Sequence, residues 1–144
     1  MKKLLLIAVA VLMGAALFTG CDTSDEPYMR SVDVLIKNND WTEAKDNYGN
    51  IRSLFVDVDF PEITRRVINN GAVLAYVFNA DGMQEPLTSS LWGDYVYQSE
   101  YYTYEEVITF AYTVNRVRFY YNTSDFDYPS DQPGDLSFRV VIMQ

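Results

Sequence analysis

Apolar and polar residues alternate along most of the chain after residue 30, which predicts a protein built from β-strands. In the clearest run, 54–60, every second residue is apolar, so one face is expected to meet the core and the other mostly water. The same pattern predicts strands at 32–37, 107–112, 117–121 and 136–142, with a hairpin turn near Asn115. The run 72–78 is apolar on both faces, which is typical of a central strand covered from two sides.

Other segments break the alternation. Pro61 suits the first turn of a helix, and the apolar residues after it have helical spacing until Gly71, so a short helix is expected at 62–70. Residues 92–104 are expected to form one strand rich in tyrosine. Irregular segments, marked by asparagine, glycine and proline, are expected at 41–50, 84–92 and 123–135, the second of which is alternatively a short edge strand.

About seven or eight short strands and one small helix favour two packed antiparallel sheets. The expected fold class is all-β, mainly an antiparallel β-sandwich, formed by residues 31–144 as a single domain. A closed barrel would use the same strands without free edges, and the pattern does not distinguish the two architectures.

The first 20 residues have a different pattern. Two lysines follow Met1, and the apolar segment 4–18 precedes the small residues Thr19 and Gly20. This order is typical of a secretory signal peptide, and the segment is shorter than the roughly 20 apolar residues that cross a bilayer. Residues 17–21 resemble the lipobox of bacterial lipoproteins, whose cysteine receives a diacylglyceryl group on sulfur before the leader is removed.

Cys21 is the only cysteine of the chain. A single exported thiol invites oxidation or intermolecular pairing, so lipidation explains it better than an ordinary secreted protein whose cysteine happens to lie at the cleavage point. The acyl chains would anchor the protein to a membrane. Residues 21–30 are expected to be a flexible acidic tether, because they offer little apolar surface. Within it, Ser24, Asp25 and Glu26 resemble the signal that sends Bacteroidetes lipoproteins to the outer face of the outer membrane.

Removal of the leader would leave 124 residues with 9 basic and 20 acidic side chains, a net charge of −11. Nucleic acid is therefore not an expected partner, because phosphate binding needs clustered lysine and arginine. The chain has no histidine, the commonest general base and transition-metal ligand. With Cys21 acylated, cysteine nucleophiles and histidine-assisted serines are both excluded, so no enzyme activity, cofactor or zinc site is expected.

Residues 62–78 combine a short helix, an Asn-Gly stop and an apolar strand that ends in tyrosine and phenylalanine. Together with the lipobox, the strand 117–121 and the closing run 138–142, they resemble small Bacteroidetes lipoproteins of unknown function. The resemblance covers most of the chain, and the elements that carry it are structural and not catalytic. It implies a β-sandwich in the cell envelope, and it implies neither an activity nor site residues.

Aromatic residues are concentrated outside the strands that most evidently form the core. Exposed rings stack on sugars or anchor protein partners. On this ground the candidate ligand-binding residues are Trp41, Trp92, Tyr95, Tyr97, Tyr102 and Tyr104. The alternative role of the same rings is packing between the sheets or over the ends of the sandwich. Tyr95 and Tyr97 are expected to share one face, and Tyr102 and Tyr104 to share one.

Two groups of carboxylates have a spacing compatible with chemistry. Asp57 and Asp59 lie two apart on one strand, as paired carboxylates of glycoside hydrolysis could. A solvated strand face is the expected role, and a carboxylate-based hydrolase is a remote alternative. Asp125, Asp127 and Asp131 share an acidic loop in which oxygen atoms can gather around calcium, but their spacing does not match an EF-hand, so a solvated loop without metal is expected.

These features predict a non-enzymatic, lipid-anchored protein of the cell envelope, located at the outer membrane and, through the residues after Cys21, at the cell surface. The expected role is a surface module that binds a glycan or a protein ligand. The alternative role is a structural or assembly component of an outer-membrane complex or a pilus-like polymer, joined through an edge strand.

Overall fold

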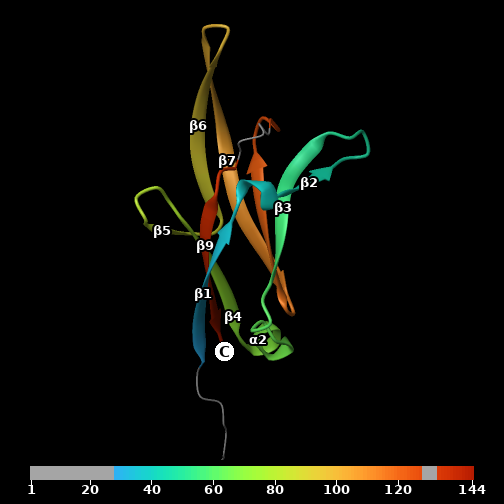
Figure 1. Ribbon diagram of the computed structural model, residues 1–144, viewed down its shortest axis with the longest axis vertical. Coiled ribbons are helices and arrows are strands. Elements are labelled where there is room, and N and C mark those ends of the chain that lie inside the picture. The colour runs from blue at the N-terminus through green and yellow to red at the C-terminus, as the bar shows by residue number, and fades with distance from the viewer. Residues whose placement is uncertain (1–27, 128–132) are drawn as a thin grey trace, which may run out of the picture.

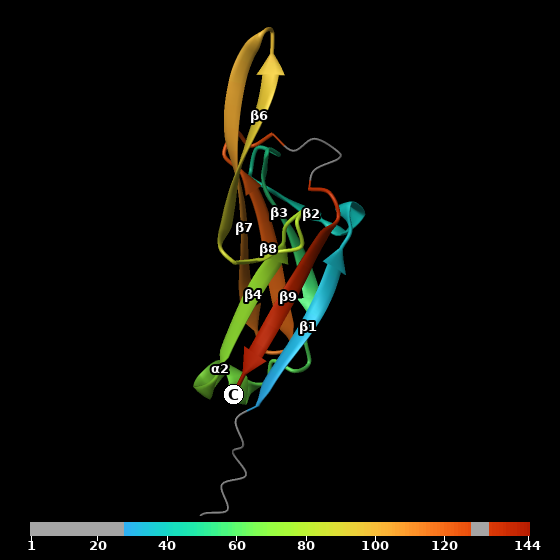
Figure 2. The same cartoon turned by 90° about the vertical axis from the view of Figure 1, so that its left-hand side faces the viewer.

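The computed structural model describes residues 28–127 and 133–144, so the predicted signal peptide, Cys21 and most of the predicted tether lie outside the described residues. Within the described ranges, no helix is both long and apolar enough to cross a membrane. The same ranges contain nine strands, one short α-helix and one turn of 3-10 helix (Figures 1 and 2). The strands form two antiparallel sheets, which confirms the all-β sandwich.

The two sheets have four and five strands. Sheet A has the order β1-β9-β4-β5, with bounds Met29–Ile36, Leu136–Met143, Ala72–Phe78 and Gln84–Pro86. Sheet B has the order β2-β3-β8-β7-β6, with bounds Thr42–Lys45, Ile51–Asp59, Arg116–Thr123, Glu100–Thr113 and Ser89–Tyr97. Each sheet ends in two edge strands, so the described strands form a sandwich and not a closed barrel.

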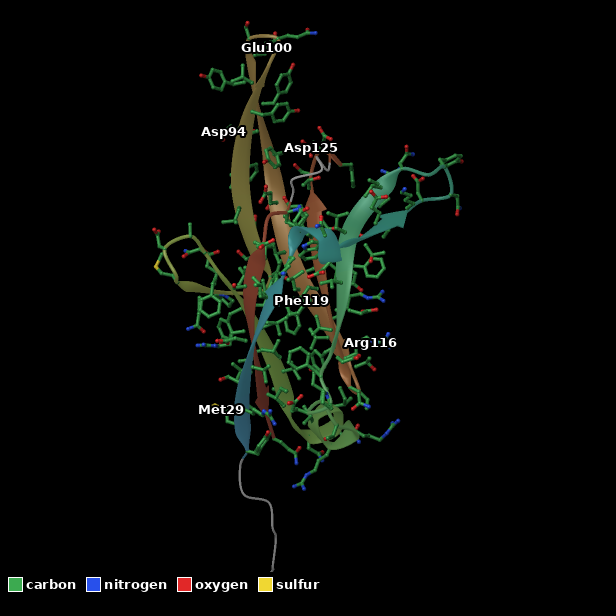
Figure 3. All side chains as sticks on the ribbon, viewed as in Figure 1. Met29, Asp94, Glu100, Arg116, Phe119 and Asp125 are labelled. Carbon is green, nitrogen blue, oxygen red and sulfur yellow. The ribbon has the colours of Figure 1, made fainter. Side chains whose placement is uncertain are left out.

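The core lies between the sheets and is formed by alternate residues of the central strands. The most completely buried positions of β8 and β9 are Val117, Phe119, Tyr121, Phe138, Val140 and Ile142. The rings of Phe119 and Phe138 meet across the core with 4.2 Å between their centroids, and Figure 3 labels Phe119 between the sheets. The predicted alternation of these strands is therefore confirmed.

The helix is shorter than predicted, because α2 spans Arg65–Asn70 and not 62–70. Its N-cap is Thr64, whose side-chain oxygen accepts a hydrogen bond from the backbone N–H of Val67 at 3.3 Å. The helix therefore starts after the threonine that caps it, and not at the earlier proline. Gly71 ends the helix, and its N–H donates to the carbonyl of Val67 at 2.9 Å.

Two predictions of local structure are wrong, because in both segments the secondary structure depends on pairing with another strand and not on the local sequence pattern. Residues 41–50 are not all loop: after the 3-10 turn η2 (Asn38–Asp40), β2 pairs with β3, although its sequence shows no alternation. Residues 92–104 are a hairpin and not one strand. The turn lies at Gln98 and Ser99, whose φ angles of 49° and 69° are left-handed. Neither residue is glycine or asparagine, so the usual sequence signal of a tight hairpin is missing.

The prediction that β4 is covered on two faces is also wrong. Val73, Ala75 and Val77 are buried, but Leu74 on the other face is 41% exposed. β4 is hydrogen-bonded to β9 on one side and to the short edge strand β5 on the other, which confirms the edge-strand alternative for that segment. An apolar residue on the outer face of a sheet is common, because proteins lack enough polar surface to cover themselves.

Replacing Phe119 with alanine is expected to lower the free energy of unfolding by about 3–5 kcal/mol, because the ring fills the space between the sheets. Urea unfolding followed by far-UV circular dichroism measures this change. Phe126, which is 52% exposed, provides the matched control, and Phe126→Ala is expected to cost less than about 1 kcal/mol. Similar losses in the two variants would contradict the assigned core.

Candidate functional site

Sheet B extends beyond the sandwich as a two-stranded ribbon. β8 pairs with β7 only as far as Glu106, whereas β6 and β7 continue to pair up to their turn. We call residues 92–105 the aromatic arm. It projects past both sheets at one end of the molecule in the two perpendicular views of Figures 1 and 2, and Figure 3 labels Glu100 at its tip. At its base, Ser124 is bonded to Glu105 through two hydrogen bonds of 2.9 Å.

One face of the arm continues the core-facing side of sheet B. Positions 102 and 104 have the same parity along β7 as Ile108, which is 2% exposed in the core. Beyond the end of sheet A, this face carries tyrosines that pack on one another. The ring of Tyr95 stacks on Tyr102 with 5.3 Å between centroids and meets Tyr104 at 6.0 Å in a tilted arrangement. Tyrosine suits such a position because its body is apolar and its rim is polar.

Gly93 makes room for this tyrosine cluster. It lies directly opposite Tyr104 across the ribbon, and a Cβ at position 93 would lie 2.5 Å from Cζ of that ring. A glycine inside a strand weakens the strand, and here the close approach of an aromatic ring explains it. The hydroxyl of Tyr102 donates to Glu100 at 3.0 Å, and this hydrogen bond raises the pKa of Tyr102 above its usual value.

The opposite face of the arm exposes large apolar side chains. Trp92, Val96 and Tyr101 are 72%, 57% and 83% exposed. Val96 and Tyr101 are direct cross-strand partners, and Trp92 lies four residues before Val96, so all three share this face. A group of exposed apolar residues on one element is a mark of an interaction site.

The structure brings together most of the predicted ligand-binding residues and separates one. Trp92, Tyr95, Tyr102 and Tyr104 lie on the arm, and the last two share a face with Tyr95. Tyr97 lies on β6, but its side chain is outside the described part of the chain. Trp41 is elsewhere, packed against the core with its ring 6.2 Å from that of Tyr121.

Sequence reasoning missed Val96 as a site residue and did not place Tyr101 beside it. Their position opposite one another follows from the hairpin register, and the hairpin was not predicted because its turn lacks the usual residues. Once the turn is known, counting alternate residues outward from it along both strands places Val96 and Tyr101 on one face.

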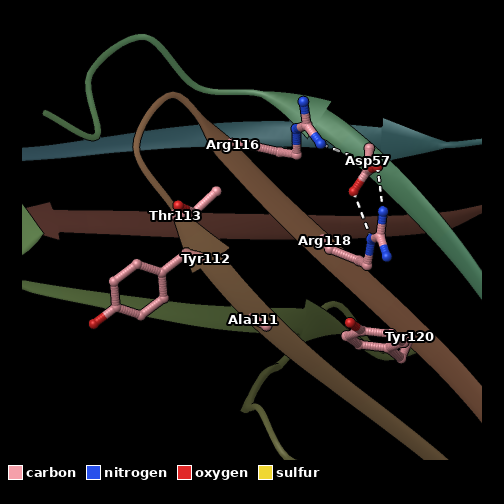
Figure 4. A pocket seen from close by; sticks show the side chains of 7 residues that line it. All are labelled: Asp57, Ala111, Tyr112, Thr113, Arg116, Arg118 and Tyr120. Atoms are coloured by element: carbon pink, nitrogen blue, oxygen red, sulfur yellow. Dashed lines mark hydrogen bonds and ion pairs between the residues drawn. The ribbon is translucent and has the colours of Figure 1, made fainter.

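A second candidate site is a shallow pocket of about 180 Å³ on the outer face of sheet B (Figure 4). Its lining includes Asp57, Tyr112, Arg116, Arg118 and Tyr120. Arg118 donates from Nε and Nη2 to the two carboxylate oxygens of Asp57 at 2.7 and 2.6 Å, and these hydrogen bonds hold the pKa of Asp57 below its usual value. Asp59 does not line the pocket. Asp57 is therefore an ionised acceptor, and it has no proton to donate as a general acid near neutral pH.

An equivalent pair of arginine and aspartate lies on the outer face of sheet A. Arg139 donates to both oxygens of Asp33 at 2.7 Å, and its guanidinium lies over the ring of Phe78. Arg118 likewise lies over Phe55, with 4.4 Å from Cζ to the ring centroid. Because an arginine–aspartate pair with its guanidinium over an aromatic ring occurs on both sheets, the role indicated for the Asp57–Arg118 pair is to join neighbouring strands.

The calcium candidates do not form a coordinating group in the part of the chain that the structure describes, and Asp131 lies outside it. The carboxylate of Asp125 accepts a hydrogen bond from the backbone N–H of Asp127 at 3.2 Å. This bond organises a turn, the usual role of an aspartate in a loop.

Comparisons of the chain with protein-family models, with curated proteins and with solved structures gave no match. The resemblance to Bacteroidetes lipoproteins therefore stays a prediction from the sequence. What the aromatic arm can bind follows from its own chemistry. It carries large rings with polar edges, and the outer edges of its two strands pair with no other strand among residues 28–127 and 133–144.

Replacing Gly93 with alanine is expected to displace the ring of Tyr104 and loosen the arm, because the new Cβ would overlap with the ring. Amide hydrogen exchange should become at least about tenfold faster in the arm and stay unchanged in β9. Gly134→Ala is the control, since no atom lies within 4 Å of a Cβ at that position. Unchanged exchange in Gly93→Ala would contradict the packing described for the arm.

Proposed function

We propose that this chain is a non-enzymatic, lipid-anchored protein of the bacterial cell envelope, which binds a glycan or a protein ligand through its aromatic arm. A lipid on Cys21 holds it at the outer membrane, on the cell surface if the residues after the cysteine act as an export signal. The leader, the single cysteine and the lack of histidine support the anchor and the absence of catalysis.

The observation that carries the binding role is the position of the arm relative to the expected anchor. Figure 3 labels Met29 at one end of the molecule and Glu100 at the other. Cys21 precedes Met29 by eight residues, so a lipid on its sulfur lies within about 30 Å of that end. A membrane attached there leaves the arm pointing away from the bilayer, where it meets ligands outside.

The chemistry of the arm suits recognition of a sugar or a protein. Trp92 and Tyr101 offer wide apolar ring faces, and such residues dominate the energy of many interfaces. Asp94 lies between Trp92 and Val96 on the same face, and its carboxylate oxygens accept hydrogen bonds from sugar hydroxyls or from protein donors. The arm thus combines stacking surface with hydrogen-bond acceptors.

The alternative role, a structural or assembly component of an outer-membrane complex or a pilus-like polymer, is favoured by the outer edge of β6. Among residues 28–127 and 133–144, no strand pairs with that edge. An assembly component differs from a binding module in requiring a protein partner present in equal amounts with it.

The Cys21→Ala variant is expected to lose its lipid and leave the membrane, because the sulfur carries the only anchor that the sequence predicts. Cell fractionation and intact-mass spectrometry of the full chain measure both effects. Ser24→Ala, which keeps the cysteine, is the control for membrane attachment. A Cys21→Ala protein that stays in the membrane fraction would contradict the anchor.

The double variant Trp92→Ala, Tyr101→Ala is expected to weaken ligand binding at least about tenfold, because stacking rings contribute most to such contacts. Detergent-solubilised native chain applied to a glycan array and to intact cells provides the measurement. Tyr48→Ala is the control, because Tyr48 is 91% exposed but lies in the β2–β3 loop. Equal binding by native chain and double variant would contradict a role for the arm.

A further inference from the structure

Of the four strands at the sheet edges in the described part of the chain, β6 is the least protected. β5 has three residues and contains Pro86, and β2 has four residues with an irregularity in register before Lys45. β1 carries Arg30 and Asp33 within its eight residues. Lysine, arginine, proline and short length are the devices that stop an edge from pairing with another chain. β6 is nine residues long, has no lysine, arginine or proline, and has Asp94 as its single charged residue.

The charge around β6 has one sign. The sequence has no lysine or arginine between Arg66 and Arg116, and this stretch includes the whole arm. The arm itself carries Asp94, Glu100 and Glu105. Pairing of β6 with β6 of a second copy would bring together two arms of the same negative charge, and like charges at an interface disfavour association. The strand that fits this edge is therefore a cationic one.

We propose that the arm binds an extended segment of a partner protein as an additional strand on the outer edge of β6, and that this segment alternates lysine or arginine with apolar residues. The inference rests on the proposed function and narrows its ligand to a protein. Backbone hydrogen bonds to the open edge supply affinity. Side chains of the added strand would meet Trp92 and Val96 on one face and the tyrosine cluster on the other.

The probes are three synthetic peptides of about nine residues, the length of β6. The first alternates lysine with valine, the second has glutamate for every lysine, and the third has proline for every second valine. Fluorescence anisotropy with the full lipid-anchored chain in non-ionic detergent measures binding. The lysine peptide is expected to bind at least about tenfold more tightly than either of the others, and more weakly at high salt. Equal binding of the glutamate or the proline peptide would overturn the proposal.

Hydrogen exchange locates the bound peptide. Saturation with the lysine peptide is expected to slow amide exchange in 89–97 and to leave β1 unchanged, because only the β6 edge gains hydrogen-bond partners. Protection elsewhere in the molecule, without protection of β6, would overturn the proposal.

Val96→Lys and Thr103→Lys form a matched pair of variants. Thr103 pairs with Asp94, so it shares one face of the arm with Val96, but only Val96 lies on β6. Val96→Lys is expected to weaken binding of the lysine peptide at least about tenfold, and Thr103→Lys less than about threefold, because a lysine on the strand that receives the peptide obstructs strand pairing. Hydrogen exchange of each free variant shows whether its arm still forms. Equal losses in two folded variants would mean binding to the face, against the proposal.

Other outcomes separate this inference from the proposed function. If no peptide binds while the ligand on arrays or cells still depends on Trp92 and Tyr101, strand addition is wrong and the binding role stands. If the double variant also leaves ligand binding unchanged, both fail. A concentration-dependent dimer in sedimentation, abolished by Val96→Lys, would make a second copy the occupant and overturn the proposal.

Discussion

The packing of β8 against β9 is the contact on which the rest of the structure depends. Each is a central strand, with β3 and β7 beside β8 and with β1 and β4 beside β9. The Phe119–Phe138 contact joins the sheets, and the alternation of buried and exposed residues along both strands fixes their register. A slip of one residue would turn the buried side chains outward and bring Arg118 and Arg139 into the core. The ion pairs on the two outer faces are therefore consequences of the same packing.

The aromatic arm exists because neighbouring strands of sheet B differ in length. β7 has 14 residues and β8 has eight, so part of β7 continues with β6 as its only strand partner in the described chain. A two-stranded ribbon is marginally stable by itself. Stacking of Tyr95 on Tyr102, and the space that Gly93 leaves for Tyr104, supply contacts that the opposite sheet supplies elsewhere. The arm thus holds its shape with rings that remain partly open to solvent.

Opposite ends of the molecule have different roles in the proposed function. The end near Met29 is where the described chain begins, and it is the side on which a lipid anchor would lie. The other end combines exposed rings, an open strand edge and carboxylates without a basic residue in the arm. Attachment and recognition are thus separated along the long axis, so a ligand can approach the arm without displacing the domain from the membrane.

The sequence by itself determined the strands with strict alternation, such as 54–60 and 136–142, together with a short helix stopped by Gly71, because these depend on local periodicity and local turn residues. It also predicted most of the arm's aromatic residues, while the leader and Cys21 remain predictions. Only the tertiary structure decided which aromatic residues are buried. Tyr121 is buried and Tyr101 is 83% exposed, although both belong to strands of one sheet. A tyrosine ring is stable in either setting, so its exposure depends on whether another sheet lies opposite it.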